Sequence, residues 1–212
     1  MPTPTSDRPL LTGSMCAASV RLYALALGAG TLMVDREERH LPLRHSHHRY
    51  TVLAPDGPVT LTVPLDHATC RMDVPFSQVR ISEHGNWRHL HWNTLSSAYG
   101  RSPYFSLAAP DLEAVIMGGQ RSLAEFNAQL HAFVVDFLAL PVTTVYDAPM
   151  PADGAWDLRR QLRTKHDERL PVSDVPYYQL WTDRFVPGLS ILDLLFNLGR
   201  EAIFPLRAAV NV

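Results

Sequence analysis

A segment rich in aromatic, imidazole and amide side chains runs from Ser82 to Phe105. It holds two Trp, two Tyr, three His and two Asn within this short stretch. Such side chains stack on ring faces, exchange hydrogen bonds and, in the case of imidazole, carry protons near neutral pH. If the protein has a binding or catalytic site, this segment is where we expect it first.

The spacing within the segment predicts a helix from Trp87 to about Tyr99, with Asn86 as its N-cap residue. On a helical wheel His91 shares a face with apolar residues such as Leu95, whereas His89 points to the other side. Two interpretations of His91 remain open. It is either a core histidine bonded to a backbone carbonyl, or a general base at the floor of a cleft.

Aromatic residues along one border of this helix are candidates for substrate binding. Trp92 and Tyr99 are seven residues apart and therefore lie along the same side of the predicted helix. Tyr104, which follows Pro103, could form a further aromatic wall of a binding site. Rings arranged in this way bind the faces of sugars or nucleobases, although they are also ordinary core anchors. Asn86 could orient a substrate, with helix capping as the alternative role.

A second cluster reads Arg44-His45-Ser46-His47-His48-Arg49. Three His in four residues suggest a metal site, but in a strand His45 and His47 would share one face while His48 takes the other. No pattern of carboxylates or cysteines accompanies them, so we expect no metal here. Arg49 is interpreted as a donor to a phosphate or carboxylate, with a solvated basic edge as the alternative.

Alternation and turn residues predict a hairpin near residues 49–64 around the Pro55-Asp56-Gly57 turn, and a third strand over 76–82. We expect α+β architecture, with a small mixed or antiparallel sheet packed against several helices. Residues 1–13 are expected to be a flexible arm and 14–212 a single domain. The other predicted elements are helices at 14–27, 110–117, 122–138, 155–169 and 189–197, and strands at 31–35 and 141–146.

The bulk composition excludes several classes of protein. A formal net charge of −2 gives no electrostatic attraction to nucleic acid or to a membrane surface. No apolar run is long enough to span a bilayer, and the two cysteines, Cys16 and Cys70, fit a reducing compartment, so we expect a cytoplasmic protein. The GxSxG, Walker A, GxGxxG and HExxH motifs are missing, and the cofactor is left unknown by the sequence.

Three ordered stretches resemble the WbqC-like family. They read HHRYTVLAPDGPVTLTVP, GNWRHLHWNTLSSAYGRSPYF and FVPGLSILDLLFNLGREA, and together they run from about residue 44 to 202. The chain departs from the family at Ala18 to Tyr23, where an early proline motif is absent. It departs again at Ser46-His47-His48-Arg49, where only the last Arg matches the family pattern. These departures imply altered specificity or lost activity.

The resemblance implies a bacterial protein linked to O-antigen and other surface-polysaccharide gene clusters, but no mechanism. The first hypothesis is an enzyme that transfers an acyl or aminoacyl group to an activated sugar, such as a nucleotide sugar, or to a related small anionic substrate. His91 would be its base, Arg49 its anion donor, and Asn86, Trp92, Tyr99 and Tyr104 would bind substrate. The second is a non-catalytic module that binds a glycan precursor or a partner protein. Neither hypothesis fixes an oligomeric state.

Overall fold

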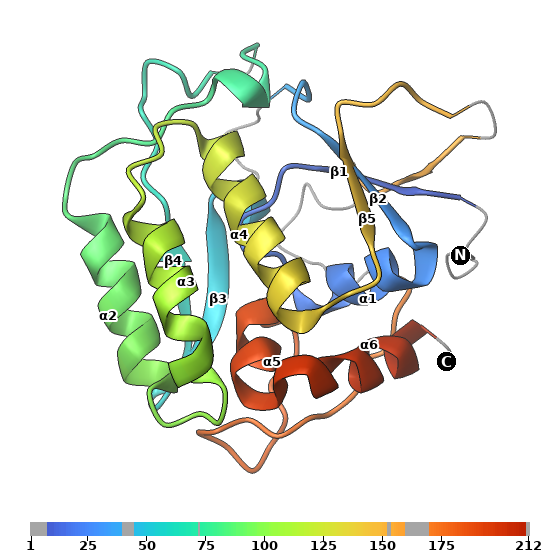
Figure 1. The fold of residues 1–212 in the computed structure, drawn as a ribbon. Coiled ribbons are helices and arrows are strands. Elements are labelled where there is room, and N and C mark those ends of the chain that lie inside the picture. Colours follow the sequence, from blue (N-terminus) through green and yellow to red (C-terminus); the bar gives the residue numbers. More distant parts are fainter. Residues whose placement is uncertain (1–7, 40–44, 72, 152–153, 160–169, 211–212) are drawn as a thin grey trace.

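Four parallel strands form the main sheet of the protein in a computed structural model, which describes residues 8–39, 45–71, 73–151, 154–159 and 170–210 (Figure 1). Their spatial order is β5-β2-β1-β6. The strands are β1 (Leu10–Gly13), β2 (Thr31–Asp35), β5 (Thr143–Tyr146) and β6 (Trp156–Asp157). Leu10 pairs with Leu32 and, on its other side, with Trp156, so the short strand β1 lies inside the sheet.

Two helices cover one face of this sheet. Side chains alternate along a strand, so Thr12 of β1, Val34 of β2 and Tyr146 of β5 point to the same face. Helices α1 (Val20–Ala29) and α4 (Leu123–Leu138) pack over that face and line a cavity together with these three residues. Helix α1, which connects β1 to β2, and helix α4, which leads into β5, therefore lie on the same side of the sheet. This is expected when both parallel crossovers have the same handedness.

A separate hairpin stands on the other side of α4 (Figure 1). Its strands, β3 (Arg49–Ala54) and β4 (Gly57–Thr62), pair in antiparallel register from Arg49 with Thr62 to Ala54 with Gly57. Two helices, α2 (Trp87–Tyr99) and α3 (Phe105–Met117), lie beside it. The described chain ends with α5 (Ile191–Leu198), the 3-10 turn η5 (Gly199–Ala202) and α6 (Ile203–Val210). Two other 3-10 turns, η1 (His45–His47) and η2 (Phe76–Gln78), lie earlier in the sequence. This arrangement confirms the α+β class and the hairpin.

The longest helix, α4, forms as its sequence predicts. The Ser122 hydroxyl accepts a hydrogen bond from the Glu125 backbone, which satisfies one of the unpaired N–H groups at the helix start. Leu123, Phe126 and Leu130 recur at helical spacing and are almost completely buried. Each contributes about 1.5–3 kcal/mol of burial free energy, so this stripe holds α4 between the sheet and the rest of the core.

Residues 76–82 differ from the predicted third strand. Phe76, Val79 and Ile81 are buried, which explains the alternation in the sequence. Their backbones, however, bond to separate loops rather than to one neighbouring strand, with Phe76 N–H donating to Glu38 and Ile81 N–H to Arg121. The segment therefore begins as the 3-10 turn η2 and continues through isolated bridges.

The predicted flexible arm over residues 1–13 requires a correction at its end. Residues 10–13 form β1, and Leu10 is completely buried between two neighbouring strands. Residues 1–7 lie outside the described part of the chain. The helix predicted over 155–169 begins instead with strand β6, and its residues 160–169 also lie outside the described part. Helix α1 begins at Val20 instead of Ser14, because Ser19 caps it after a left-handed turn at Ala17. No helix among the described residues is long and apolar enough to cross a membrane.

Candidate active site at the carboxyl edge of the sheet

The carboxyl ends of the parallel strands meet at one edge of the sheet. The chain builds β1, β2 and β5 in one direction and then returns to add β6 on the other side of β1. In open sheets of this kind, ligands bind outside the carboxyl ends of the strands where the strand order reverses. The residues that end or follow these strands, beginning with Gly13 and Asp35, are therefore the first place to look for a site.

The turn from β1 into α1, where such sheets often hold a phosphate, is covered by the chain itself. The Ser190 hydroxyl donates to the Ala17 carbonyl over 2.7 Å, and the Ile191 N–H donates to the Ala18 carbonyl over 2.9 Å. The first N–H group of α1, at Val20, donates to the carbonyl of Leu189. The helix start is thereby closed to a phosphate group.

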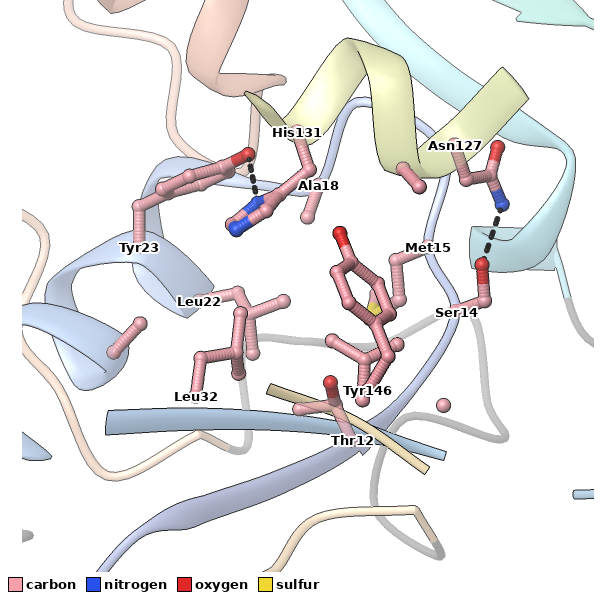
Figure 2. A pocket seen from close by; sticks show the side chains of 14 residues that line it. Thr12, Ser14, Met15, Ala18, Leu22, Tyr23, Leu32, Asn127, His131 and Tyr146 are labelled. Carbon is pink, nitrogen blue, oxygen red and sulfur yellow. Dashed lines mark hydrogen bonds between the residues drawn. The ribbon is translucent and has the colours of Figure 1, made fainter. Parts of the chain in front are cut away.

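A small cavity lies next to this turn, between the sheet, α1 and α4 (Figure 2). Its volume of about 30 Å³ holds roughly two water molecules. It is partly open, and the half-buried residues among its lining are Met15, Ala128, His131 and Tyr146. The buried lining residues are Thr12, Gly13, Ser14, Ala18, Leu22, Tyr23, Ala26, Leu32, Val34 and Asn127.

His131 on α4 is held between two hydroxyl groups at this cavity. Its Nδ1 lies 2.9 Å from the Tyr23 hydroxyl, and its Nε2 lies 2.8 Å from Oγ1 of Thr144. Each hydroxyl can donate or accept, so both neutral tautomers of the imidazole satisfy the same contacts. Burial lowers the pKa of His131 to about 4, with a smaller opposing effect of Asp136, and the ring is neutral at pH 7. The three groups form a chain along which a proton can shift.

The hydroxyl of Tyr146 points into the cavity between His131 and Asn127 (Figure 2). It makes no hydrogen bond to any described residue, while the Arg36 guanidinium lies 5.0 Å from the centre of its ring. Burial raises the pKa of Tyr146, and the nearby Arg36 lowers it to a lesser extent. The phenol is therefore protonated at neutral pH and available as a donor.

Asn127 is the second polar residue that α4 contributes. Its Nδ2 donates to the Ser14 hydroxyl over 3.2 Å and to the His47 carbonyl over 2.9 Å, which fixes the orientation of the amide. Its Oδ1 is buried and has no hydrogen-bond partner among the described residues. A buried acceptor without a donor costs free energy, and Figure 2 shows this oxygen turned away from the Tyr146 hydroxyl and the cavity.

The opposite face of the same edge carries charged residues around a hollow of about 260 Å³. Arg159 donates to Asp35 over 2.6 Å and to Asp157 over 2.7 Å. Arg36 pairs with Asp147 over 2.6 Å. An anionic ligand would have to displace these carboxylates, so neither Arg36 nor Arg159 offers a free guanidinium to phosphate.

His91, the base expected from the sequence, lies in the interior with 1% of its surface exposed. Its Nε2 lies 3.1 Å from the Thr62 carbonyl, which can only accept, so Nε2 carries the proton. Nδ1 then accepts from the Tyr50 hydroxyl over 3.1 Å. Burial lowers its pKa to about 4, with Arg88 contributing in the same direction and the Thr62 bond opposing. This geometry favours the core-histidine interpretation that the sequence left open.

Arg49, the expected anion donor, does not face His91. It precedes Tyr50 in β3, so the two side chains point to opposite faces of the hairpin, and Tyr50 is the one that contacts His91. In the preceding run, His47 and His48 are buried, whereas the Arg44 and His45 side chains lie outside the described ones. Within the described residues, no three His, Cys, Asp or Glu side chains are grouped closely enough to hold a metal ion.

The other candidates from the sequence are distributed between surface and core. Asn86 is exposed at the N-cap of α2, in a left-handed conformation and without a side-chain capping bond. Trp92 is half-buried and stacks on Phe105. Tyr104 is half-buried against Gly199, where a Cβ would lie 2.5 Å from the nearest atom of the Tyr104 ring. Tyr99 is completely buried. The structure therefore does not bring these residues together around one cavity.

The cavity residues on α4 were missed by the sequence reasoning, although a signal was present. Asn127 and His131 are four residues apart and fall beside the apolar stripe of a helix that is otherwise well patterned. Polar groups at such positions must find partners when the helix packs. Their partners, Ser14 and Tyr23, lie more than 100 residues away in sequence and could not be identified from spacing.

A model of the WbqC-like protein family matches residues 42–173 and 168–204. The two matches overlap and together cover well over half of the chain. Searches of curated proteins and of solved structures gave no match. The match begins after β2, so the cavity residues on β1, α1 and β2 lie outside it. Asn127, His131 and Tyr146 lie within the matched residues.

Proposed function

The chain belongs to the WbqC-like protein family, and from this premise we propose that it is an enzyme acting on an activated sugar at the carboxyl edge of the sheet. The reaction is the transfer of an acyl or aminoacyl group in surface-polysaccharide biosynthesis. The association of the family with polysaccharide gene clusters suggests the substrate class. The arrangement of Tyr23, His131 and Thr144 suggests where proton transfer would occur.

The observation that carries the proposal is the difference between the two buried histidines. A backbone carbonyl locks the tautomer of His91, so this ring cannot pass a proton on without breaking its contacts. His131 lies between two hydroxyls and can exchange tautomers within unchanged contacts. When a sugar hydroxyl or amine attacks the acyl carbonyl of a thioester donor, the nucleophile loses a proton and the thiolate leaves. The relay can take up that proton at one hydroxyl and release one from the other hydroxyl, to the thiolate or to water.

The experiment combines binding and turnover. The protein is titrated with nucleotide-activated sugars by calorimetry, and then incubated with them and with an acyl thioester or aminoacyl donor. Mass spectrometry of the sugar reports the mass of the transferred group. We expect His131→Gln to retain binding and to lose turnover by at least about 100-fold, the usual contribution of acid–base catalysis. His89→Ala, an exposed histidine on α2, serves as the matched control and should behave as wild type.

The alternative is a module that binds a glycan precursor without catalysis. It is favoured by the small volume of the cavity, which leaves little room for a second substrate beside the sugar. Under this alternative, nucleotide sugars bind wild type and His131→Gln equally well and no acylated product forms. Absence of both binding and turnover would contradict the enzyme and the precursor-binding module together.

A further inference from the structure

We propose that the cavity between the sheet, α1 and α4 binds a short N-acyl group, such as the acetamido group of an amino sugar. This inference rests on the proposed function and adds the chemical class of the sugar substituent that enters the protein. Three properties of the cavity lead to it, namely its charge, its size and the arrangement of its polar atoms.

The lining carries no Asp, Glu, Lys or Arg among the described residues. Its titratable members are His131, Tyr23 and Tyr146, and all three are neutral at pH 7 because burial disfavours their charged forms. A phosphate, a carboxylate or a protonated amine would enter without a counter-charge and at a high desolvation cost. The group that occupies this space is therefore uncharged.

The volume sets an upper limit on that group. About 30 Å³ accommodates roughly two water molecules, which corresponds to a few heavy atoms and is too small for a sugar ring. A substituent of a sugar can enter while the ring stays outside. The half-buried residues Met15, Ala128, His131 and Tyr146 would then form the mouth of the cavity.

The polar atoms match an amide. Two lining hydroxyls, those of Thr12 and Tyr146, make no hydrogen bond to any described residue, and the Tyr146 hydroxyl is directed into the space (Figure 2). Each can donate to a carbonyl or accept from an N–H group. The remaining walls include Leu22, Leu32 and Val34, which are apolar and buried. An N-acyl group presents one N–H donor, one carbonyl acceptor and one alkyl group. A hydroxyl would leave the apolar walls unused, and an amine would bring a charge.

The test uses N-methylacetamide as the probe, titrated into isotopically labelled protein and followed by NMR at the cavity residues Ala18, Ala26 and Leu32. We expect a saturable shift at these residues. Methyl acetate has the same shape but lacks the N–H, and it should bind about three- to tenfold more weakly, the effect of one hydrogen bond. Acetate, which is charged, should cause no shift at these positions.

Two tyrosine variants provide the matched comparison. Tyr146→Phe removes only the hydroxyl in the cavity and should weaken N-methylacetamide about three- to tenfold. Tyr178→Phe changes an exposed tyrosine that does not line the cavity and should leave the titration unchanged. Equal binding of the amide and the ester, or shifts confined to residues elsewhere, would overturn the inference.

The nucleotide-sugar titration separates this inference from the proposed function. UDP-N-acetylglucosamine should bind more tightly than UDP-glucose, and Tyr146→Phe should reduce that preference. Equal affinity of both sugars, with turnover that depends on His131, would reject the N-acyl group and retain the enzyme. Saturable amide binding in the cavity, without turnover of any sugar, would retain the inference about the ligand and reject the enzyme.

Discussion

The Tyr99 hydroxyl donates to Oδ1 of Asp193 across 2.7 Å and thereby joins α2 to α5 inside the protein. The same hydroxyl accepts from the Leu53 N–H over 2.9 Å, which ties the hairpin to this pair. Asp193 is completely buried and also accepts from Tyr177 and Gln179. Burial raises the pKa of the Asp193 carboxyl, and these hydrogen bonds oppose the shift. These donors are all neutral, so hydrogen bonds and not an ion pair hold the Asp193 carboxyl in the interior.

Tyr99→Phe should therefore lower the free energy of unfolding by about 1–3 kcal/mol, because the carboxylate loses a donor and the Leu53 N–H loses its acceptor. Tyr177→Phe is the matched variant, since it removes a donor from the same carboxylate but leaves the hairpin contact intact. Urea denaturation followed by circular dichroism measures both. Equal costs for the two variants would show that the contact with Leu53 contributes nothing.

His91→Ala should destabilise the fold by about 2–4 kcal/mol. The substitution leaves a cavity and removes the partners of the Thr62 carbonyl and the Tyr50 hydroxyl. His89→Ala, two residues away on the exposed side of α2, should stay within about 0.5 kcal/mol of wild type. A folded His91→Ala protein of wild-type stability that lost catalytic activity would restore His91 as a functional residue.

Acid should weaken the fold before the carboxylates titrate. The pKa of His91 falls from an ordinary value of 6.5 to about 4 in the folded state, so the unfolded chain binds a proton first. Its contribution is complete above pH 6.5 and is lost as the pH falls from 6.5 to 4, by about 3 kcal/mol in total. Urea midpoints at pH 7.5, 5.5 and 4.5 measure this loss together with that of His131, whose pKa burial also lowers to about 4. The slope should be smaller in His91→Ala, and a flat wild-type profile would contradict the expectation.

Gly13→Ala tests how tightly the end of β1 is packed. A Cβ at this position would collide with the Glu38 carboxylate and lie 2.9 Å from Cε1 of His47. We expect a loss of about 1–3 kcal/mol, the usual cost of overpacking. In the background of Glu38→Ala the same substitution should cost less, because one of the two obstructing groups has gone. Additive costs in this double-mutant cycle would exclude the collision as the cause.

Local signals predicted individual elements well and the sheet poorly. Helix α2 and strand β2 have the predicted bounds, because capping residues and Gly30 mark their ends. Strand β1 has four residues and β6 has two, which is too short for alternation to be recognised. Their parallel pairing joins residues far apart in sequence. Parallel strands are not connected by a short hairpin turn, so the sequence contains no local signal for this pairing.

The sequence reasoning proposed a site on α2 and missed the cavity beside α4 for a related reason. Aromatic and imidazole groups were concentrated in α2, but a helix packed against a hairpin on one side uses such groups to fill its interface, as Trp87 and His91 do. The side chains around the cavity are sparse in sequence, and three elements supply them. Only tertiary contacts such as that between Tyr23 and His131 bring them together.

The cover over the β1–α1 turn affects how the chain can be made. The hydrogen bond between Ser190 and Ala17 spans 173 positions, so synthesis must pass Ser190 before the turn acquires its partners. Until then the unit formed by β1, α1 and β2, which ends at Asp35, exposes backbone groups and apolar surface to the cell. Contacts of such separation slow folding, and a chaperone that binds this nascent unit would protect it from aggregation.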